Sequence, residues 1–103
     1  MNTATETGVD PKEAADRLRH LLYGQDIGVV MATTAIHGSR DISRDTPSLA
    51  AFHVEKPDCY IGNFVEGFGL CEVRFAKSGC RFLTTEEVEK FERCERAVGP
   101  FPR

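Results

Sequence analysis

The sequence predicts an α+β domain in which an antiparallel β-meander of three to five strands is flanked by an N-terminal and a C-terminal helix. Two observations lead to this prediction. Segments with helical spacing and capping residues lie near both ends of the chain, and short apolar segments separated by glycine and proline turns lie between them. The 103 residues suffice for one core, and the separation of helices from strands disfavours a doubly wound parallel sheet.

Composition narrows the class of protein. Hydrophobic residues make up 41% of the chain and charged residues 28%, as in ordinary globular domains. No apolar run approaches the roughly 18 residues of a transmembrane helix, so we expect no membrane partner. The first ten residues lack the basic and apolar parts of a secretory signal, which indicates a cytoplasmic protein. The net charge of −3 disfavours nucleic acid as a partner.

The N-terminal helix is expected over residues 11–23, after a flexible tail at 1–9. Asp10 can cap this helix, Pro11 suits its first position, and Glu13 can reach back to the cap. Ala14, Leu18, Leu21 and Leu22 form its apolar stripe, and Gly24 is expected to end it. The domain is expected to span residues 10–99 and to be followed by a short tail at 100–103.

Residues 27–36 are nearly all apolar or β-branched. Periodicity alone fits both a helix and a strand, and we favour an extra strand at the edge of the sheet. Residues 37–48 are polar, contain Gly38 and Pro47, and carry the triplet Ser-Arg-Asp twice, so they are predicted to form a long surface loop. A short strand is expected at 49–54 and a turn at 55–58.

A β-hairpin is predicted from strands 59–65 and 70–76, joined by a turn at 66–69. In this register Phe64 faces Cys71, Gly62 faces Val73, Ile61 faces Arg74 and Tyr60 faces Phe75. A last strand is expected at 80–83 and adds to the same face. This aromatic-rich face then carries Tyr60, Phe64, Cys71, Val73, Phe75, Cys80 and Phe82. A capping box at Thr84–Glu87 opens the C-terminal helix, whose Val88 and Phe91 are expected to pack on that face.

The opposite face of the hairpin is half aliphatic and half charged. Its candidate interface residues are Ile61, Val65, Leu70, Arg74, Arg81 and Leu83. Three explanations stay open: the N-terminal helix covers this face, the face is the outer wall of a small barrel, or it contacts a partner. The short strands, glycine turns and aromatic residues of 49–84 resemble SH3-like and Tudor-like small barrels, and we transfer no function from this resemblance.

Reactive side chains are few. His37, Arg40, Asp41, Arg44, Asp45 and His53 could supply a general base and an anion clamp, and the alternative is an exposed, hydrated loop. The four cysteines have no CxxC spacing, so reduced thiols are expected, with Cys80 beside Arg81 the best placed for a nucleophile. We predict no catalytic residue, no metal site and no cofactor, and we favour a non-enzyme.

Three functions remain as hypotheses. The first is an interaction module that binds a protein partner or itself, as a dimer, through the half-aliphatic face. The second is a small-molecule-binding protein or small enzyme with a pocket lined by Tyr60, Phe64 and Phe75 and with polar contacts from His37, His53, Arg40 and Arg44. The third is a small-barrel nucleic-acid-binding module that uses Phe68, Arg74 and Arg81.

Overall fold

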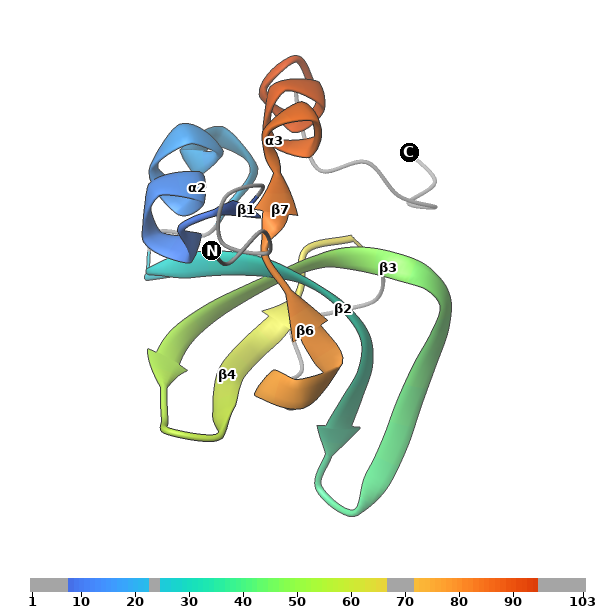
Figure 1. Cartoon of the computed structure of the whole chain (residues 1–103). Helices are drawn as coiled ribbons and strands as arrows, with labels where there is room; N and C mark the ends of the chain where they lie inside the picture. The colour runs from blue at the N-terminus through green and yellow to red at the C-terminus, as the bar shows by residue number, and fades with distance from the viewer. Residues whose placement is uncertain (1–7, 23–24, 67–71, 95–103) are drawn as a thin grey trace, which may run out of the picture.

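The computed structural model describes residues 8–22, 25–66 and 72–94 (Figure 1). Its elements, in chain order, are β1 (Gly8–Val9), α2 (Pro11–Arg17), η1 (Arg19–Leu21), β2 (Gly28–His37), β3 (Arg40–Glu55), β4 (Cys59–Phe64), β5 (Val73–Ala76), η2 (Lys77–Gly79), β6 (Cys80–Arg81), β7 (Leu83–Thr84) and α3 (Thr85–Glu92). All described strand pairings are antiparallel. The predicted α+β class, with helices before and after an antiparallel sheet, is therefore confirmed.

The first half of β2 and the second half of β3 are buried on both faces of the sheet. Side chains alternate between a helix-side core, which includes Val29, Met31, Leu49 and Ala51, and a barrel core, which includes Val30, Ala32, Ala50 and Phe52. A strand buried on both faces reads as a continuous apolar run, which is why its period was ambiguous. The prediction of a strand here is confirmed. Its edge position is wrong, because β2 pairs with β3, β5 and β6.

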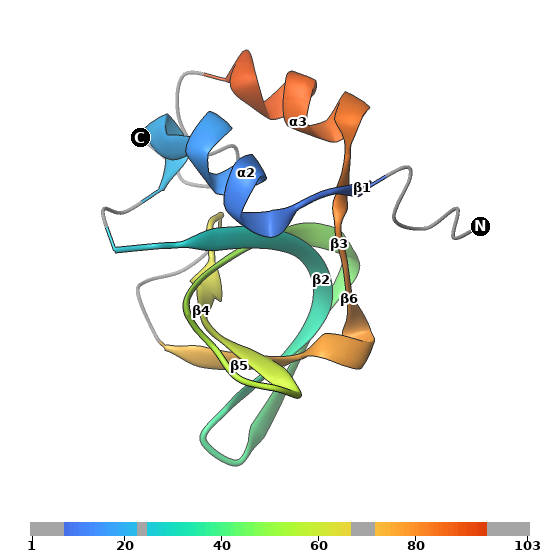
Figure 2. The same ribbon diagram turned by 60° about the vertical axis from the view of Figure 1, so that its left-hand side comes forward.

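The larger sheet closes into a small barrel, with the two helices lying on one side of it (Figure 2). Its strand order is β3-β4-β5-β2-β6, and β3 also pairs with β2. Between β2 and β5 the register consists of one residue pair, Ile36 with Arg74. The outer-wall explanation for the half-aliphatic face thus applies to part of the hairpin.

The predicted hairpin register is confirmed where both strands are described. Tyr60 lies opposite Phe75, and Gly62 lies opposite Val73. The expected pair of Phe64 with Cys71 lies outside the described residues. Inside the barrel the Tyr60 ring stacks on Phe52 at 4.2 Å between ring centroids, and the Phe64 ring meets Phe75 edge-on at 5.1 Å. These rings form the aromatic core that the register predicts.

The last predicted strand joins a different neighbour from the expected one. After η2, Cys80 pairs with Ala32 of β2 rather than with β5, and its side chain packs against the barrel core. Phe82 falls between β6 and β7 and is 38% exposed. The expectation that Phe82 pairs with Phe75 and joins the aromatic core is therefore wrong, because the chain crosses to the other edge of the sheet.

Residues 37–48 are not a loop. Gly38 and Ser39 form a two-residue turn between His37 and Arg40, and Gly38 has a φ of 65°, a conformation that favours glycine. Beyond the turn, β3 continues as a polar arm of the β2–β3 hairpin, which projects from the barrel (Figures 1 and 2). Residues 44–47 stand opposite Thr33 alone, and the strand bends there. One face of this arm packs on the barrel core through the opposed pair of Ala35 and Ile42, and the other face meets solvent.

Helix α2 is shorter than predicted. The Asp10 carboxylate accepts hydrogen bonds from the Lys12 and Glu13 amides, which confirms the cap. The helix ends at Arg17, because the Leu18 amide is shared between the carbonyls of Ala14 and Ala15 and the chain tightens into η1. The expected stop at Gly24 lies outside the described residues.

Strand β1 corrects the predicted tail at its last two positions. Gly8 pairs with Thr84 and Val9 with Leu83, and Val9 contributes to the helix-side core. Figure 1 shows β1 beside β7. The N-terminal segment is thus attached to the strand that leads into α3. None of the helices among residues 8–22, 25–66 and 72–94 is long and apolar enough to cross a membrane.

Helix α3 begins at the predicted capping box. The Thr84 hydroxyl accepts from the Glu87 amide, and the Thr84 amide donates to the Glu87 carboxylate. Val88 packs in the helix-side core with Leu83, and Phe91 packs against it. The expected packing of Val88 and Phe91 on the aromatic face is wrong, because β6 pairs with β2 and directs α3 to the opposite face of the sheet.

Substitution of Gly62 by alanine is expected to destabilise the fold strongly. A Cβ at this position would overlap the carbonyl oxygen of Ala51 and the Cα of Phe52, both backbone atoms of the neighbouring strand. We expect Gly62→Ala to lower the free energy of unfolding by about 3 kcal/mol in urea denaturation. Gly79→Ala is the control, because its Cβ would meet only the Thr34 hydroxyl at 3.3 Å. Equal effects of the two variants would contradict the close approach at Gly62.

Glu87 is expected to stabilise the fold in a pH-dependent way. The Arg81 guanidinium, 2.8 Å away, lowers the pKa of Glu87. Because the folded pKa is depressed, this stabilisation is present above the ordinary carboxyl pKa and is lost as pH falls through the folded value. We expect Glu87→Gln to lower the free energy of unfolding by about 1 kcal/mol at neutral pH, and by much less in strong acid. Glu86→Gln, on the same helix turn, should have a smaller effect at both pH values. A Glu87→Gln effect that persists in acid would rule out the charge pair as its cause.

Candidate functional site

A row of side chains crosses the outside of the barrel from one strand to the next. Val54 of β3 lies opposite Ile61 of β4, Ile61 opposite Arg74 of β5, Arg74 opposite Ile36 of β2, and Ile36 opposite Asp41 of the β3 arm. Directly opposed residues share a face of the sheet. Ile36 is 37% exposed and Val54 36%, whereas Ile61 is half-buried. We call these five residues the outer row.

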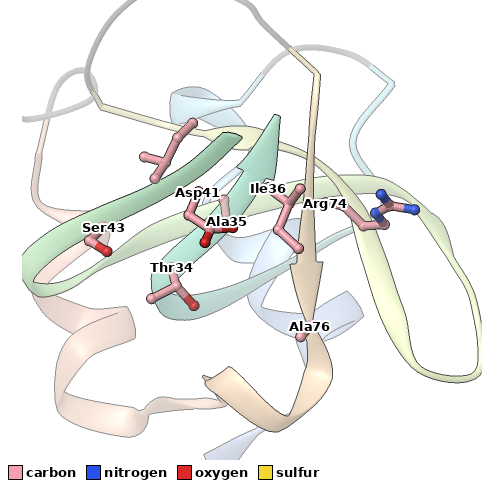
Figure 3. Close-up of a pocket in the computed structure, with 8 residues that line it drawn as sticks. Thr34, Ala35, Ile36, Asp41, Ser43, Arg74 and Ala76 are labelled. Atoms are coloured by element: carbon pink, nitrogen blue, oxygen red, sulfur yellow. The ribbon is translucent and has the colours of Figure 1, made fainter. Parts of the chain in front are cut away.

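Two shallow hollows flank the centre of the outer row, and Ile36 and Arg74 line both. The larger, of about 270 Å³, is also lined by Thr34, Ala35, Asp41, Ile42, Ser43 and Ala76 (Figure 3). The smaller, of about 210 Å³, is also lined by Gly38, Ile61, Glu72 and Val73. The hollows occur where β2 and β5 share only one residue pair, so the backbones diverge on either side of it. Both are smaller than the roughly 300–1,000 Å³ of pockets that enclose a drug-sized ligand.

The charged members of the outer row have no partner within the described part of the chain. Neither Arg74 nor Asp41 makes a hydrogen bond or ion pair there, and both side chains are exposed. By contrast, Arg81 forms a two-pronged pair with Glu87. Figure 3 shows Ile36 between Asp41 on one side and Arg74 on the other. The row therefore presents a cation, an aliphatic side chain and an anion in sequence.

A β-bulge places His53 beside this row. The register shifts between Phe52 and Val54, which leaves His53 as the extra residue. Phe52 is buried in the barrel, whereas His53 and Val54 are both accessible to solvent. The His53 Nε2 lies 2.9 Å from a carboxylate oxygen of Glu72. Glu72 is thus engaged by its own chain, unlike Arg74 two residues later.

The residues predicted to bind a small ligand do not come together. His37 and Arg40 face each other at the exposed hairpin turn, and His53 contacts Glu72. The Arg44 guanidinium lies 4.0 Å from the centre of the Phe64 ring and donates to the Glu66 carbonyl. Tyr60 and Phe75 are buried in the barrel core with 7% and 0% exposure. The expected aromatic lining of a pocket is instead packed ring against ring.

The predicted interface residues are divided between two environments. Ile61 and Arg74 belong to the outer row. Leu83 is fully buried in the helix-side core, and Val65 packs against that core, so the helices cover this part of the predicted face. Arg81 is tied to Glu87 on α3. Leu70 and Phe68 lie outside the described residues.

Sequence reasoning missed Ile36 and Val54, and it placed Asp41 in a different candidate cluster, with His37 and Arg40. The miss follows from assigning residues 37–48 to a loop, which separated Ile36 from Asp41. A signal was present, since the Gly38-Ser39 dipeptide is typical of a two-residue hairpin turn. That turn places Ile36 directly opposite Asp41.

The cysteines in the described part of the chain include no activated thiol and no metal cluster. Cys59, Cys80 and Cys94 are free thiols. Burial raises the pKa of Cys80 to about 11, and its Sγ donates to the Ala76 carbonyl, so the thiolate needed of a nucleophile is disfavoured. In the part of the chain that the structure describes, no group of three or more His, Cys, Asp or Glu is placed to hold a metal ion.

Comparison with known proteins gives no family for this chain. It matches no protein-family model, no curated protein and no solved structure. The fold and the site therefore define the class of protein only as a small antiparallel barrel with two helices on one side and an exposed, partly apolar outer row.

Alkylation of Cys80 is expected to be slow in the folded protein. Because the pKa is raised from 9.0 to about 11, the thiolate fraction at mildly alkaline pH is about 100-fold lower than for an unshifted thiol. We expect the iodoacetamide reaction at Cys80, followed by peptide mass spectrometry, to accelerate about 100-fold in urea. A folded-state rate within a few-fold of the urea rate would show that burial does not suppress the thiolate, contrary to this expectation.

Proposed function

We propose that this protein is an interaction module that binds a partner protein, or a second copy of itself, through the outer row. The observation that supports this proposal is Arg74, which has no partner in the described chain and lies on the barrel wall between the exposed Ile36 and the half-buried Ile61. Arginine is enriched at protein interfaces and can supply much of their binding energy. Clustered exposed aliphatic side chains also mark contact surfaces more often than isolated ones do.

The depth of the surface favours a protein over a small molecule. The two hollows at Arg74 have volumes of about 270 Å³ and 210 Å³, and they lie side by side along the wall. A shallow surface of this kind suits side chains of a partner better than an enclosed ligand. The rings proposed for a ligand pocket fill the barrel core instead.

The charge distribution argues against nucleic acid. The net charge is −3, and Arg81, one of the two arginines proposed for stacking and steering, is neutralised by Glu87. Arg74 alone does not make the basic stripe that follows a phosphate backbone. Protein binding in the cytoplasm, where free thiols such as Cys59 and Cys80 persist, is the setting we propose.

A lysine substitution in the outer row is expected to abolish binding without unfolding the protein. Ile36→Lys places a charge at an exposed position in the centre of the row. Ile27→Lys is the matched control, because Ile27 is 42% exposed and lies outside the row. The measurements are affinity capture from the source cells and gel filtration with light scattering. We expect a captured protein or a self-associated form that the Ile27→Lys variant keeps and the Ile36→Lys variant loses.

Two results would overturn the proposal. One is a strict monomer that captures no protein. The other is capture or self-association that Ile36→Lys leaves unchanged relative to Ile27→Lys. Circular dichroism of both variants checks that the fold is retained.

A further inference from the structure

We infer that the outer row binds a second copy of this chain, with Arg74 of each copy facing Asp41 of the other across an Ile36–Ile36 contact. This inference rests on the proposed function and names its partner. It starts from the order of three neighbouring residues across the sheet: Arg74, Ile36 and Asp41. They come from β5, β2 and the β3 arm, so their spacing is set by adjacent strands, about 4.8 Å apart.

The order of these residues makes the row complementary to itself. A two-fold axis that runs parallel to β2 and passes over Ile36 leaves Ile36 opposite its own copy and exchanges the two flanking positions. Each Arg74 is then opposite an Asp41 of the other copy, which gives two ion pairs around one apolar contact. Interfaces with two-fold symmetry require this kind of self-complementary patch.

The neighbouring rows agree with the same axis. Thr34 lies opposite Ser43 within the chain, and Ala76 lines the same hollow, so the axis places Ala76 opposite Ser43 of the second copy. On the other side, Glu72 would face the turn at Gly38 and Ser39 rather than another carboxylate. No like charges of the row or its neighbours are brought together, and like-charge contacts are what usually exclude a wrong pairing.

The unpaired, opposite charges of Arg74 and Asp41 favour a second copy of the chain over a partner that is uniformly acidic or uniformly basic. Both residues lack an ion-pair partner in the described chain, and the two are separated by Ile36. An acidic segment would satisfy Arg74 and oppose Asp41, and a basic segment would do the reverse. A second copy satisfies both at once and also covers the exposed Ile36 side chain.

Charge reversal tests the pairing directly. We expect the full chain to reach a concentration-dependent dimer in sedimentation equilibrium. Arg74→Asp and Asp41→Arg each convert the two ion pairs of the dimer into two like-charge contacts. Each variant should therefore raise the dissociation constant of the dimer more than about tenfold. An equimolar mixture of the two variants should form a heterodimer, and the double variant should dimerise again. Lys12→Asp, an equal change of charge at an exposed position on α2, should have no effect.

Each result decides the inference. A strictly monomeric chain, dimers indifferent to both reversals, or single variants that the mixture does not rescue would each overturn it. The proposed function is judged separately, because a captured protein that is lost with Ile36→Lys would support binding through the outer row even if the chain is a monomer. Rescue in the mixture is the expected result, since a purely structural defect at either position would not be repaired by the other variant.

Discussion

The burial of β2 on both faces is the constraint on which the rest of this structure depends. Val29 and Met31 point to the helices, while Val30 and Ala32 point into the barrel, so β2 must lie between two cores. A strand in this position needs neighbours on both edges, and β3, β5 and β6 provide them. The barrel, the helix layer and the exposed wall therefore follow from the need to bury the apolar side chains of β2 on both faces of the sheet.

Features set by neighbouring residues could be predicted from the sequence. The caps at Asp10 and Thr84 were recognisable because the side chain bonds an amide only two or three residues away. The β4–β5 register was recognisable because a one-residue slip would have moved Tyr60 and Phe75 from the core to solvent. In both cases few alternative conformations compete, and interactions between residues that are near in the sequence favour one of them.

Features set by distant pairings could not be predicted in the same way. The choice of β6 between β5 and β2 depends on how the whole barrel closes, which no local pattern encodes. The outer row joins residues from β2, β3, β4 and β5, and it becomes visible only when all four pairings are known. Its central pair, Ile36 with Arg74, is the one residue pair that joins β2 to β5 in the described strands. Because residues 37–48 were assigned to a loop, the end of β2 that carries this pair was not placed in the sheet, and the site could not be predicted.

The arm of β3 has an open strand edge, which bears on whether other molecules could add strands to it. Within the described residues, Arg40 to Ser43 pair only with β2, so the other edge of this short segment has no strand partner there. Open edges of this kind can template fibril growth by adding strands from other molecules. Next to this segment the exposed Asp45 adds a charge, the strand bends, and Pro47 has no amide hydrogen to donate. The edge is thereby poorly suited to strand addition. Any association between copies of the kind proposed above would then use side-chain faces and not the strand edge.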